Sequence, residues 1–375
     1  MNKVSECISI VHIGARDGFL PITYPAIFDD CCKIILFDVA TDAEKVNPML
    51  ADGREPLSHT DWHKLAAWEN EDNLTIFNTL CPYAAGAKKL LPEFSEWYVF
   101  GNGDCDYILG EAHIEMHRST VKPIILDNLK EINSIKAVKP TIICIDAQGC
   151  SLEILKGATQ LLDTSVDVVI CEVELISFYS NAPSFGDVLT LLSQHGLRFS
   201  GFLKEESPWA NPVRMPIGLR SRPLMGSADA VFIRDPRRIS GSKDFIRLSK
   251  YAFSACICGH LDLAIWPLLN LDWSRESVVN ENKLNIFING LIDLVPSIPN
   301  IYPMSFVELS QKNQEVKKDT SNYKASLYKY CLNWIYLTIP ILNRTPIEKY
   351  LQAFGFKKLA DEVRLIRIKQ THLTS

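Results

Sequence analysis

The sequence predicts an α/β protein built on a Rossmann-like, mostly parallel β-sheet, followed by a separate helical region. Up to about residue 236, short apolar runs alternate with amphipathic stretches, as in sheets whose two faces are covered by helices. The runs are apolar almost without interruption, which is typical of strands buried on both faces. Beyond residue 238 the alternation gives way to longer segments with helical spacing.

Seven apolar runs are expected to form the strands, and the last two of them are expected to close the sheet as a pair. In chain order they are residues 8–14, 33–40, 73–80, 141–147, 166–175, 198–203 and 228–234. Helices are expected at residues 26–32, 151–162 and 185–197. The last of these helices should end at Gly196, because glycine readily adopts the left-handed conformation of a helix C-cap.

The change in pattern divides the chain into residues 1–236, the sheet domain, and residues 237–375, a helical C-terminal domain without an assigned role. Within the first part, residues 87–122 break the alternation and carry several aromatic side chains, which favours an inserted loop that covers a site. The helical region is a candidate surface for a protein partner or for self-association.

Composition excludes several classes of protein. Of 375 residues, 47% are hydrophobic and 22% are charged, as in folded globular proteins, and the net charge of -5 gives no support for nucleic-acid binding. The longest apolar run, residues 252–271, is interrupted by His260, Asp262 and Pro267, so it predicts a buried helix rather than an integral membrane span. The lack of a secretory pattern and the 11 irregularly spaced cysteines predict reduced thiols in a cytoplasmic protein.

A glycine-containing turn follows the first predicted strand, where residues 11–18 read VHIGARDG. Gly14 and Gly18 let the backbone turn tightly and let a ligand come close. The third glycine of the dinucleotide fingerprint is absent, which disfavours a nicotinamide-dependent oxidoreductase. Asp38 ends the second strand, where a carboxylate can accept hydrogen bonds from a ribose, or can instead cap a helix or lie in a solvated turn.

The most specific block is IDAQGCSLEILKGA, residues 145–158. It places Asp146 directly after a buried strand, and ligands of open α/β sheets bind at the carboxyl ends of the strands. The next apolar run, VVICEVEL, contains Glu172. Both acidic residues are therefore candidates for a site at this edge of the sheet.

This block resembles the signature of the FkbM family of methyltransferases, in which a strand ends in Ile-Asp and is followed by a glycine, an acidic residue, Leu-Lys-Gly-Ala and a strand with a glutamate. Five further segments resemble the family in the same order: VHIGARDG, LFDVA, FNTLCPYAAG, IILDNL and ADAVFIR. The resemblance covers roughly residues 8 to 235. The chain departs from the pattern at His12, where the family usually has an acidic residue, and at Gln148, where glutamate is common.

The resemblance implies a class I methyltransferase sheet of seven strands and S-adenosylmethionine as the cofactor, with the methionine part over residues 14–18 and the adenine near residues 78–80. Asp146 is expected to orient the acceptor or remove its proton, although it could also cap a helix. Glu172 is expected to hold the acceptor or to satisfy buried backbone groups. The expected cofactor-binding residues are His12, Gly14, Ala15, Arg16, Gly18, Asp38, Asn78, Thr79, Leu80, Asp146 and Gln148.

The implied activity is methylation of a hydroxyl on a sugar, a glycan or another small-molecule metabolite, and no residue is assigned to a metal. The alternative, which His12 favours, is a degenerate methyltransferase fold that acts as a binding or scaffold module through its helical C-terminal part. His113, Glu115 and His117 alternate with apolar residues, so a strand would place the three on one face. Such a face could bind a metal or supply a histidine base, or it could simply be solvated.

Overall fold

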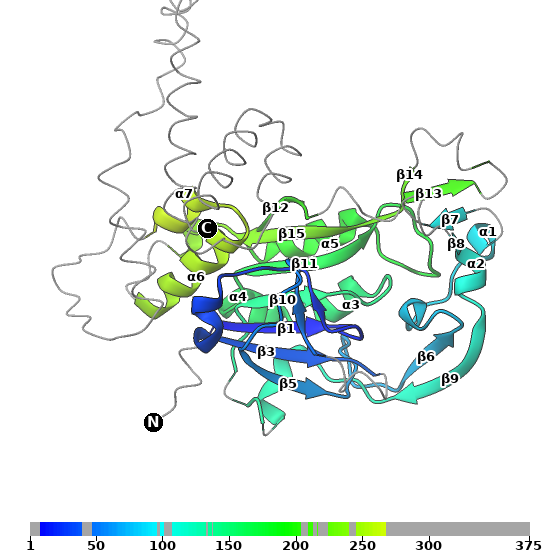
Figure 1. Ribbon diagram of the computed structural model, residues 1–375, viewed down its shortest axis with the longest axis horizontal. Helices are drawn as coiled ribbons and strands as arrows, with labels where there is room; N and C mark the ends of the chain where they lie inside the picture. The colour runs from blue at the N-terminus through cyan, green and yellow to red at the C-terminus, as the bar shows by residue number, and fades with distance from the viewer. Residues whose placement is uncertain are drawn as a thin grey trace, which may run out of the picture. The chain divides into compact units, whose positions relative to one another are not determined.

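The computed structural model describes residues 8–39, 47–95, 98–100, 107–132, 134–136, 138–203, 209–212, 216, 224–239 and 245–267. Its centre is a seven-stranded sheet with the order β12-β15-β11-β10-β1-β3-β5 (Figure 1). These strands are β1 (Ile8–Ile13), β3 (Cys32–Phe37), β5 (His59–His63), β10 (Ile142–Ile145), β11 (Val168–Glu174), β12 (Leu197–Phe202) and β15 (Ser227–Arg234). Strands β5, β3, β1, β10 and β11 pair in parallel, whereas β15 runs antiparallel to β11 and β12. The predicted α/β class with a mostly parallel sheet of seven strands is confirmed.

The third predicted strand does not belong to this sheet, and that part of the prediction is wrong. Strand β6 (Leu74–Thr79) instead pairs with β9 (Glu115–Val121) in a separate antiparallel ribbon. The edge position beside β3 is taken by β5, whose sequence is HTDWH. An edge strand is covered by a neighbour on one side only, so its residues are part-exposed and it lacks the apolar run by which the buried strands were recognised.

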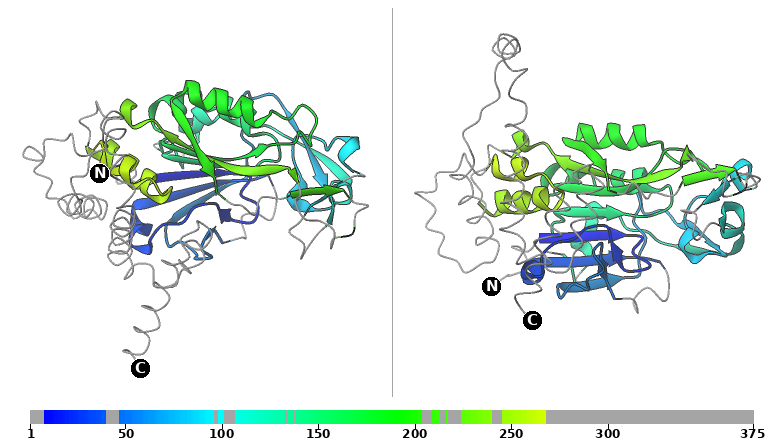
Figure 2. Two further views of the ribbon diagram at one scale, coloured as in Figure 1. Left: turned by 90° about the horizontal axis from the view of Figure 1, so that it is seen from above. Right: turned by 45° about the horizontal axis from the view of Figure 1, so that its top comes forward.

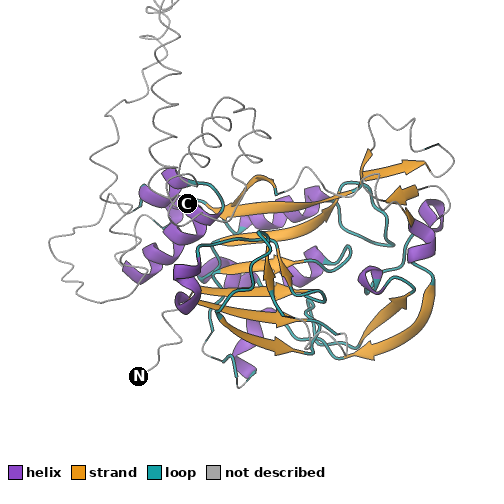
Figure 3. Ribbon diagram, viewed as in Figure 1, coloured by secondary structure: helices purple, strands orange, loops and turns teal. Residues whose placement is uncertain are grey.

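Helices cover both faces of the sheet (Figures 2 and 3). One face packs against α3 (Ser151–Lys156), α4 (Thr159–Thr164) and α5 (Phe185–Gln194). The other face packs against the 3-10 helix η2 (Ala26–Cys31) and the helices α6 (Phe245–Ile257) and α7 (Leu261–Ile265). Successive strand residues alternate between the two cores, so that Ile8 and Ile10 belong to one core and Val11 and Ile13 to the other.

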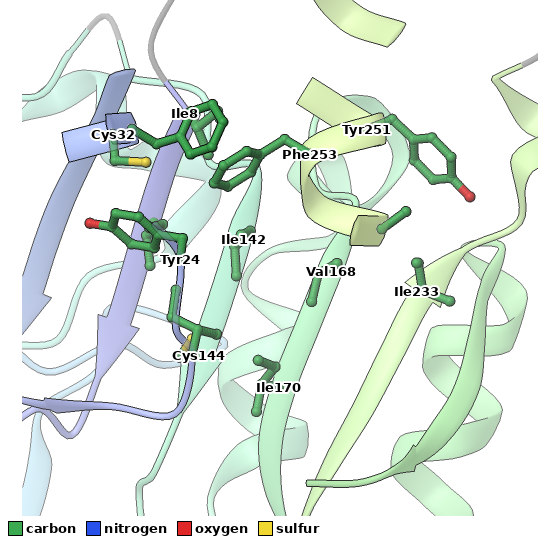
Figure 4. Packing of buried hydrophobic residues seen from close by; sticks show 14 of the residues in the cluster. Ile8, Tyr24, Cys32, Ile142, Cys144, Val168, Ile170, Ile233, Tyr251 and Phe253 are labelled. Atoms are coloured by element: carbon green, nitrogen blue, oxygen red, sulfur yellow. The ribbon is translucent and has the colours of Figure 1, made fainter. Parts of the chain in front are cut away.

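Helix α6 contributes fully buried side chains to the second of these faces. The ring of Phe253 lies 5.1 Å from that of Phe28 and 6.2 Å from that of Tyr24, and Figure 4 shows it facing Tyr24 beside Ile142. Residues 245–267 therefore belong to the same compact unit as the sheet. The boundary predicted at residue 236 stays a prediction, and the helical region after residue 267 lies outside the described residues.

The helix boundaries follow from local chemistry. The expected helix at residues 151–162 is divided into α3 and α4 at Gly157 and Ala158. Helix α5 begins with a capping box, in which Ser184 and Asp187 each accept a hydrogen bond from the other's backbone N–H. It ends before Gly196, whose φ of 77° is left-handed, so the predicted glycine stop is confirmed.

The described part of residues 87–122 surrounds a small core made by Leu109, Phe178 and Tyr179. That these residues form an inserted cover stays a prediction. The elements here are α1 (Pro92–Ser95), β7 (Tyr98–Phe100), β8 (Tyr107–Ile108), α2 (Leu109–Ala112) and β9. Strands β7 and β8 join β13 (Trp209–Pro212) and β14 (Leu224–Met225) in a four-stranded sheet. The short elements that remain are β2 (Phe19–Leu20), β4 (Met49–Leu50), η4 (Pro82–Ala84), η5 (Leu126–Glu131) and η7 (Pro236–Arg238).

Two composition-based expectations can be set beside the structure. Within the described ranges, no helix is both long enough and apolar enough to cross a bilayer. The cysteines of the same ranges are all free thiols, and several of them, such as Cys144 and Cys171, are buried in the core. The cytoplasmic location stays a prediction.

Candidate functional site

A cleft of about 350 Å³ opens at the carboxyl ends of β1, β3 and β10. The residue that follows each of these strands lines it: Gly14 after β1, Asp38 after β3 and Asp146 after β10. Parallel neighbouring strands end at the same edge of a sheet, which is why motifs far apart in the sequence meet here. The structure thus brings together the glycine turn and the two carboxylates that the sequence singled out.

Gly14 is the tightest point of this edge. Its φ is +80°, and a Cβ atom at this position would lie 1.7 Å from the carbonyl oxygen of Asp146. Backbone hydrogen bonds fix the approach, because Gly14 N–H donates to Phe37 O at 2.9 Å and Asp146 N–H donates to Ile13 O at 2.9 Å. Only glycine is compatible with both the conformation and the contact.

The charged groups of the cleft are mostly acidic. Asp17, Asp38 and Asp146 line it, against the single guanidinium of Arg16 among the described lining residues. The Asp146 side chain is open to the cleft but surrounded by protein, and this restricted hydration, followed by the carboxylates of Asp229 and Asp17, raises its pKa to about 7. Asp146 can therefore both hold and release a proton near neutral pH.

An apolar wall of the cleft comes from residues 65–68, which the sequence analysis did not single out. This segment follows β5, and two hydrogen bonds hold it: Trp68 N–H donates to Ile124 O at 2.9 Å, and Ile124 N–H donates to Ala66 O at 2.8 Å. Further apolar lining comes from Phe37, Tyr83 and Ile154. The wall could have been predicted from the apolar segment LAAW, which follows the edge strand, but only if β5 had first been recognised as a strand.

The signature block supports this wall from behind. A Cβ atom at Gly157 would lie 2.3 Å from the carbonyl oxygen of Trp68, so glycine allows the wall segment to approach α3. Glu153 of α3 accepts a hydrogen bond from Lys88 Nζ at 2.7 Å, and Lys88 also donates to Asn181 O at 2.9 Å. The glutamate and the final glycine of the signature thus hold the walls of the cleft in place.

The remaining predicted site residues fall into two groups. Besides the three strand-end residues, those that line the cleft are Arg16, Asn78 and Gln148. Those that do not line it are His12, Ala15, Gly18, Thr79, Leu80 and Glu172. Ala15 is fully buried in the core, and the Leu80 side chain is 55% exposed. The assignment of all these residues to a cofactor stays a prediction.

His12 is buried within β1 and lies on the face of the sheet opposite to Ile13, which lines the cleft. Neither of its ring nitrogens has a hydrogen-bond partner in the structure. Burial lowers the pKa of His12 to about 4, although the carboxylate of Asp17 raises it slightly, so the ring is neutral at physiological pH. It cannot reproduce the negative charge that the family usually has at this position.

Glu172 lies on β11, in register with Asp229 of β15. Burial, followed by the carboxylates of Asp146 and Glu174, raises its pKa well above the usual range, which favours the protonated form. Its backbone carbonyl accepts a hydrogen bond from Ser151 Oγ at 2.7 Å, which ties β11 to the start of α3. One carboxyl oxygen, Oε2, is buried without a partner.

The prediction that His113, Glu115 and His117 share one strand face is wrong. His113 is the C-cap residue of α2, and β9 begins only at Glu115, because the chain turns between them. Glu115 pairs with Arg118 at 2.5 Å and with Lys89 at 2.9 Å. In the part of the chain that the structure describes, no group of three or more His, Cys, Asp or Glu side chains is arranged to hold a metal ion.

The family model described as "Methyltransferase FkbM domain" matches residues 12–199. The matched range contains Gly14, Asp38 and Asp146, and it ends within β12. No match is found among curated proteins or among solved structures. The extent of the family match shows that the chain belongs to the FkbM family of methyltransferases.

Proposed function

We propose that the protein uses S-adenosylmethionine to methylate a hydroxyl group on a small molecule or a glycan. The observation that carries this proposal is the convergence of Gly14, Asp38 and Asp146 on one cleft at the carboxyl edge of the sheet. A turn that only glycine can form lets a ligand lie directly against the backbone, and the two carboxylates supply acceptors for a ribose and for the reacting group.

The cleft fits S-adenosylmethionine in chemistry as well as in place. The methionine part would lie over residues 14–18, the ribose hydroxyls would donate to Asp38, and the adenine would lie against the apolar wall of residues 65–68, near Asn78. Three carboxylates against one guanidinium favour a cationic sulfonium and disfavour the pyrophosphate of a dinucleotide.

Asp146 is the best-placed group for the reaction itself. The bound cofactor supplies a methyl group on a sulfonium, which makes the carbon reactive toward a nucleophile. Asp146 would orient the acceptor hydroxyl and accept its proton, a contribution of roughly 10²–10⁴ in rate. Positioning within the cleft would supply the larger share, about 7–11 kcal/mol by effective-molarity arguments. Glu172 lies on the neighbouring strand β11 but does not line the cleft, so it is given no contact with the acceptor.

The choice of a hydroxyl acceptor rests on the resemblance to the FkbM family and on the pKa of Asp146. A carboxylate with a pKa of about 7 is a stronger base than an ordinary aspartate, and about half of it is still ionised at neutral pH. It is therefore suited to removing a proton as a hydroxyl oxygen becomes methylated.

Isothermal titration calorimetry tests the cofactor directly. We expect S-adenosylmethionine and S-adenosylhomocysteine to bind, and NAD not to bind. Asp38→Asn should raise the dissociation constants of both nucleosides roughly 10–100-fold, which corresponds to the loss of one or two hydrogen bonds to a charged group. Asp72→Asn, an equal change of charge at an exposed turn, should leave both affinities unchanged. Absence of both heat and thermal shift with either nucleoside would contradict the proposal and favour a degenerate scaffold.

A further inference from the structure

A chain of hydrogen-bonding side chains leads from the cleft into the 87–122 region. Gln148 Oε1 lies 2.5 Å from Tyr179 Oη, and Tyr179 Oη lies 3.2 Å from His113 Nε2. His113 Nδ1 lies 2.9 Å from the backbone carbonyl oxygen of Leu109 in α2. At the other end, Gln148 and Asp146 line the same cleft, and the Gln148 side chain acts on the Asp146 carboxyl group in the direction that lowers its pKa. The chain thus connects Asp146 to an imidazole outside the sheet.

The local backbone is shaped for this chain. Gln148 has a φ of 45°, a left-handed conformation that is uncommon for a residue with a side chain, and Gly149 follows with a φ of 74°. A Cβ atom at Gly149 would lie 2.9 Å from Tyr179 Cδ2, so the missing side chain lets the tyrosine ring pack against the turn. Tyr179 itself is only 6% exposed, and its ring lies 5.6 Å from that of His113.

If every contact in this series is a hydrogen bond, donor and acceptor rules allow two arrangements. A carbonyl oxygen can only accept, so His113 Nδ1 must carry a proton. If His113 is neutral, its Nε2 is an acceptor, Tyr179 donates to it, and the amide N–H of Gln148 donates to Tyr179. The amide oxygen of Gln148 is then turned toward Asp146, which suits a protonated carboxyl group and opposes an ionised one.

The second arrangement is the reverse of the first. If His113 is protonated at both nitrogens, Nε2 donates to Tyr179, Tyr179 donates to Gln148 Oε1, and the amide N–H of Gln148 donates to the carboxylate of Asp146. This is the orientation that Gln148 has in the structure. Ionised Asp146 is thereby matched to protonated His113, and protonated Asp146 to neutral His113.

The charges around the two ends are different. Asp146 faces the carboxylates of Asp229, Asp17 and Asp38, and it also interacts with Glu172, whereas Arg16 is the cationic group of the cleft. For His113, burial lowers the pKa and the hydrogen bond to Leu109 raises it less strongly; no charged side chain among the described residues contributes. The phenol of Tyr179 has a pKa raised well above its usual value by burial and by nearby Glu172 and Glu174, so it acts as a neutral donor.

We propose that His113 and Tyr179 are positioning residues that act through Gln148 to set the ionisation of Asp146. A neutral His113 turns the amide oxygen of Gln148 toward Asp146 and holds the carboxyl group in its protonated form to a higher pH. Through His113, the 87–122 region thereby controls whether the Asp146 carboxyl group beside the sulfonium of the cofactor is charged. This inference rests on the proposed function, because it assigns Asp146 to the sulfonium end of the cleft.

The two cofactor forms provide the measurement. S-adenosylmethionine carries a sulfonium charge and S-adenosylhomocysteine does not, so the ratio of their dissociation constants, measured by calorimetry between pH 5 and pH 9, reports the charge of Asp146. With the amide N–H of Gln148 turned toward it, Asp146 has a pKa of about 7. In the unmodified protein, where neutral His113 turns the amide oxygen of Gln148 toward Asp146, the preference for S-adenosylmethionine should therefore rise through a midpoint above pH 7. Asp146→Asn gives the reference curve, which contains only the titration of the ligands themselves.

Tyr179→Phe and His113→Phe each interrupt the chain and free Gln148 to present its N–H groups to Asp146. Both variants should lower the midpoint by about one pH unit, the size of one hydrogen bond to a charged group. Tyr24→Phe is the matched control, because Tyr24 is also buried and its hydroxyl bonds to Ser58 at 2.7 Å in the opposite core; its midpoint should not move.

The possible outcomes separate the two proposals. Failure of the unmodified protein to bind either nucleoside would overturn the proposed function and this inference with it. If the unmodified protein binds the nucleosides, and folded Tyr179→Phe and His113→Phe have midpoints within about 0.3 pH units of its midpoint, the inference alone is overturned. If a variant binds both nucleosides more weakly by the same factor and the pH midpoint of their ratio is unchanged, the inference is also overturned, because a merely structural role has this effect. If Tyr179→Phe does not fold, His113→Phe decides.

Discussion

Gly14→Ala is expected to abolish cofactor binding and to destabilise the fold by more than about 4 kcal/mol, a range reached only when a substitution disrupts the backbone or the core. The new Cβ would lie 1.7 Å from the carbonyl oxygen of Asp146, and that oxygen belongs to backbone rather than to a flexible side chain. Relief of the contact requires β1 and β10 to move apart at their carboxyl ends, where the cleft forms. Urea denaturation and calorimetry with S-adenosylmethionine measure the two effects.

Gly53→Ala is the matched control for this substitution. Gly53 has the same φ of +80°, but a Cβ atom there would meet nothing within 4 Å. It should therefore show only the penalty of placing alanine in the left-handed region, about 1–2 kcal/mol, with unchanged cofactor affinity. Equal losses of stability in the two variants would show that the close approach of Gly14 to Asp146 does not exist.

Asp167→Asn is expected to destabilise the protein by about 3–5 kcal/mol, because it leaves the buried guanidinium of Arg234 and the part-exposed one of Arg247 without their counter-charge. Asp167 has no exposed surface, and its carboxylate pairs with Arg247 of α6 and, at 3.4 Å, with Arg234 of β15. The interaction ties α6 to the sheet. Asp167 precedes β11, at the end of the sheet opposite to the cleft, so the affinity for S-adenosylmethionine should stay unchanged in the folded variant.

Asp163→Asn is the control for Asp167→Asn, because it also removes one carboxylate charge from an ion pair. Asp163 pairs with His195 at 2.8 Å, but its side chain is 57% exposed. Exposed pairs contribute about 0–1 kcal/mol, so the free energy of unfolding should barely change. Similar effects of the two substitutions would mean that the carboxylate of Asp167 is hydrated rather than buried.

Much of the sheet was predictable because burial on both faces leaves a direct trace in the sequence. The runs that became β1, β3, β10, β11 and β15 were recognised by this trace. Strand β12 is a mostly exposed edge strand and was expected only as the partner of β15 in the closing pair. Strand β5 was missed because an edge strand is only half covered, and β6 was assigned to the main sheet because its apolar residues look like those of a sheet strand. Apolar pattern identifies a strand, but it does not identify the strand's neighbour.

Part of the site could be predicted for a related reason. Gly14, Asp38 and Asp146 each follow a parallel strand, and the geometry of a parallel sheet places such residues at one edge. The expectation for His113 failed because the chain turns before β9, and no periodicity records where a turn intervenes.

The fold class, the family signature and the strand-end residues of the cleft can be predicted from the amino-acid pattern, because each depends on local pattern or on chain direction. Tertiary packing determines which segment forms the wall of the cleft and which side chains connect to Asp146. Trp68 meets Gly157, and Gln148 meets Tyr179 and through it His113, across long separations in the chain. Such contacts depend on how the loops pack over the sheet edge, and nothing in the local sequence specifies that packing.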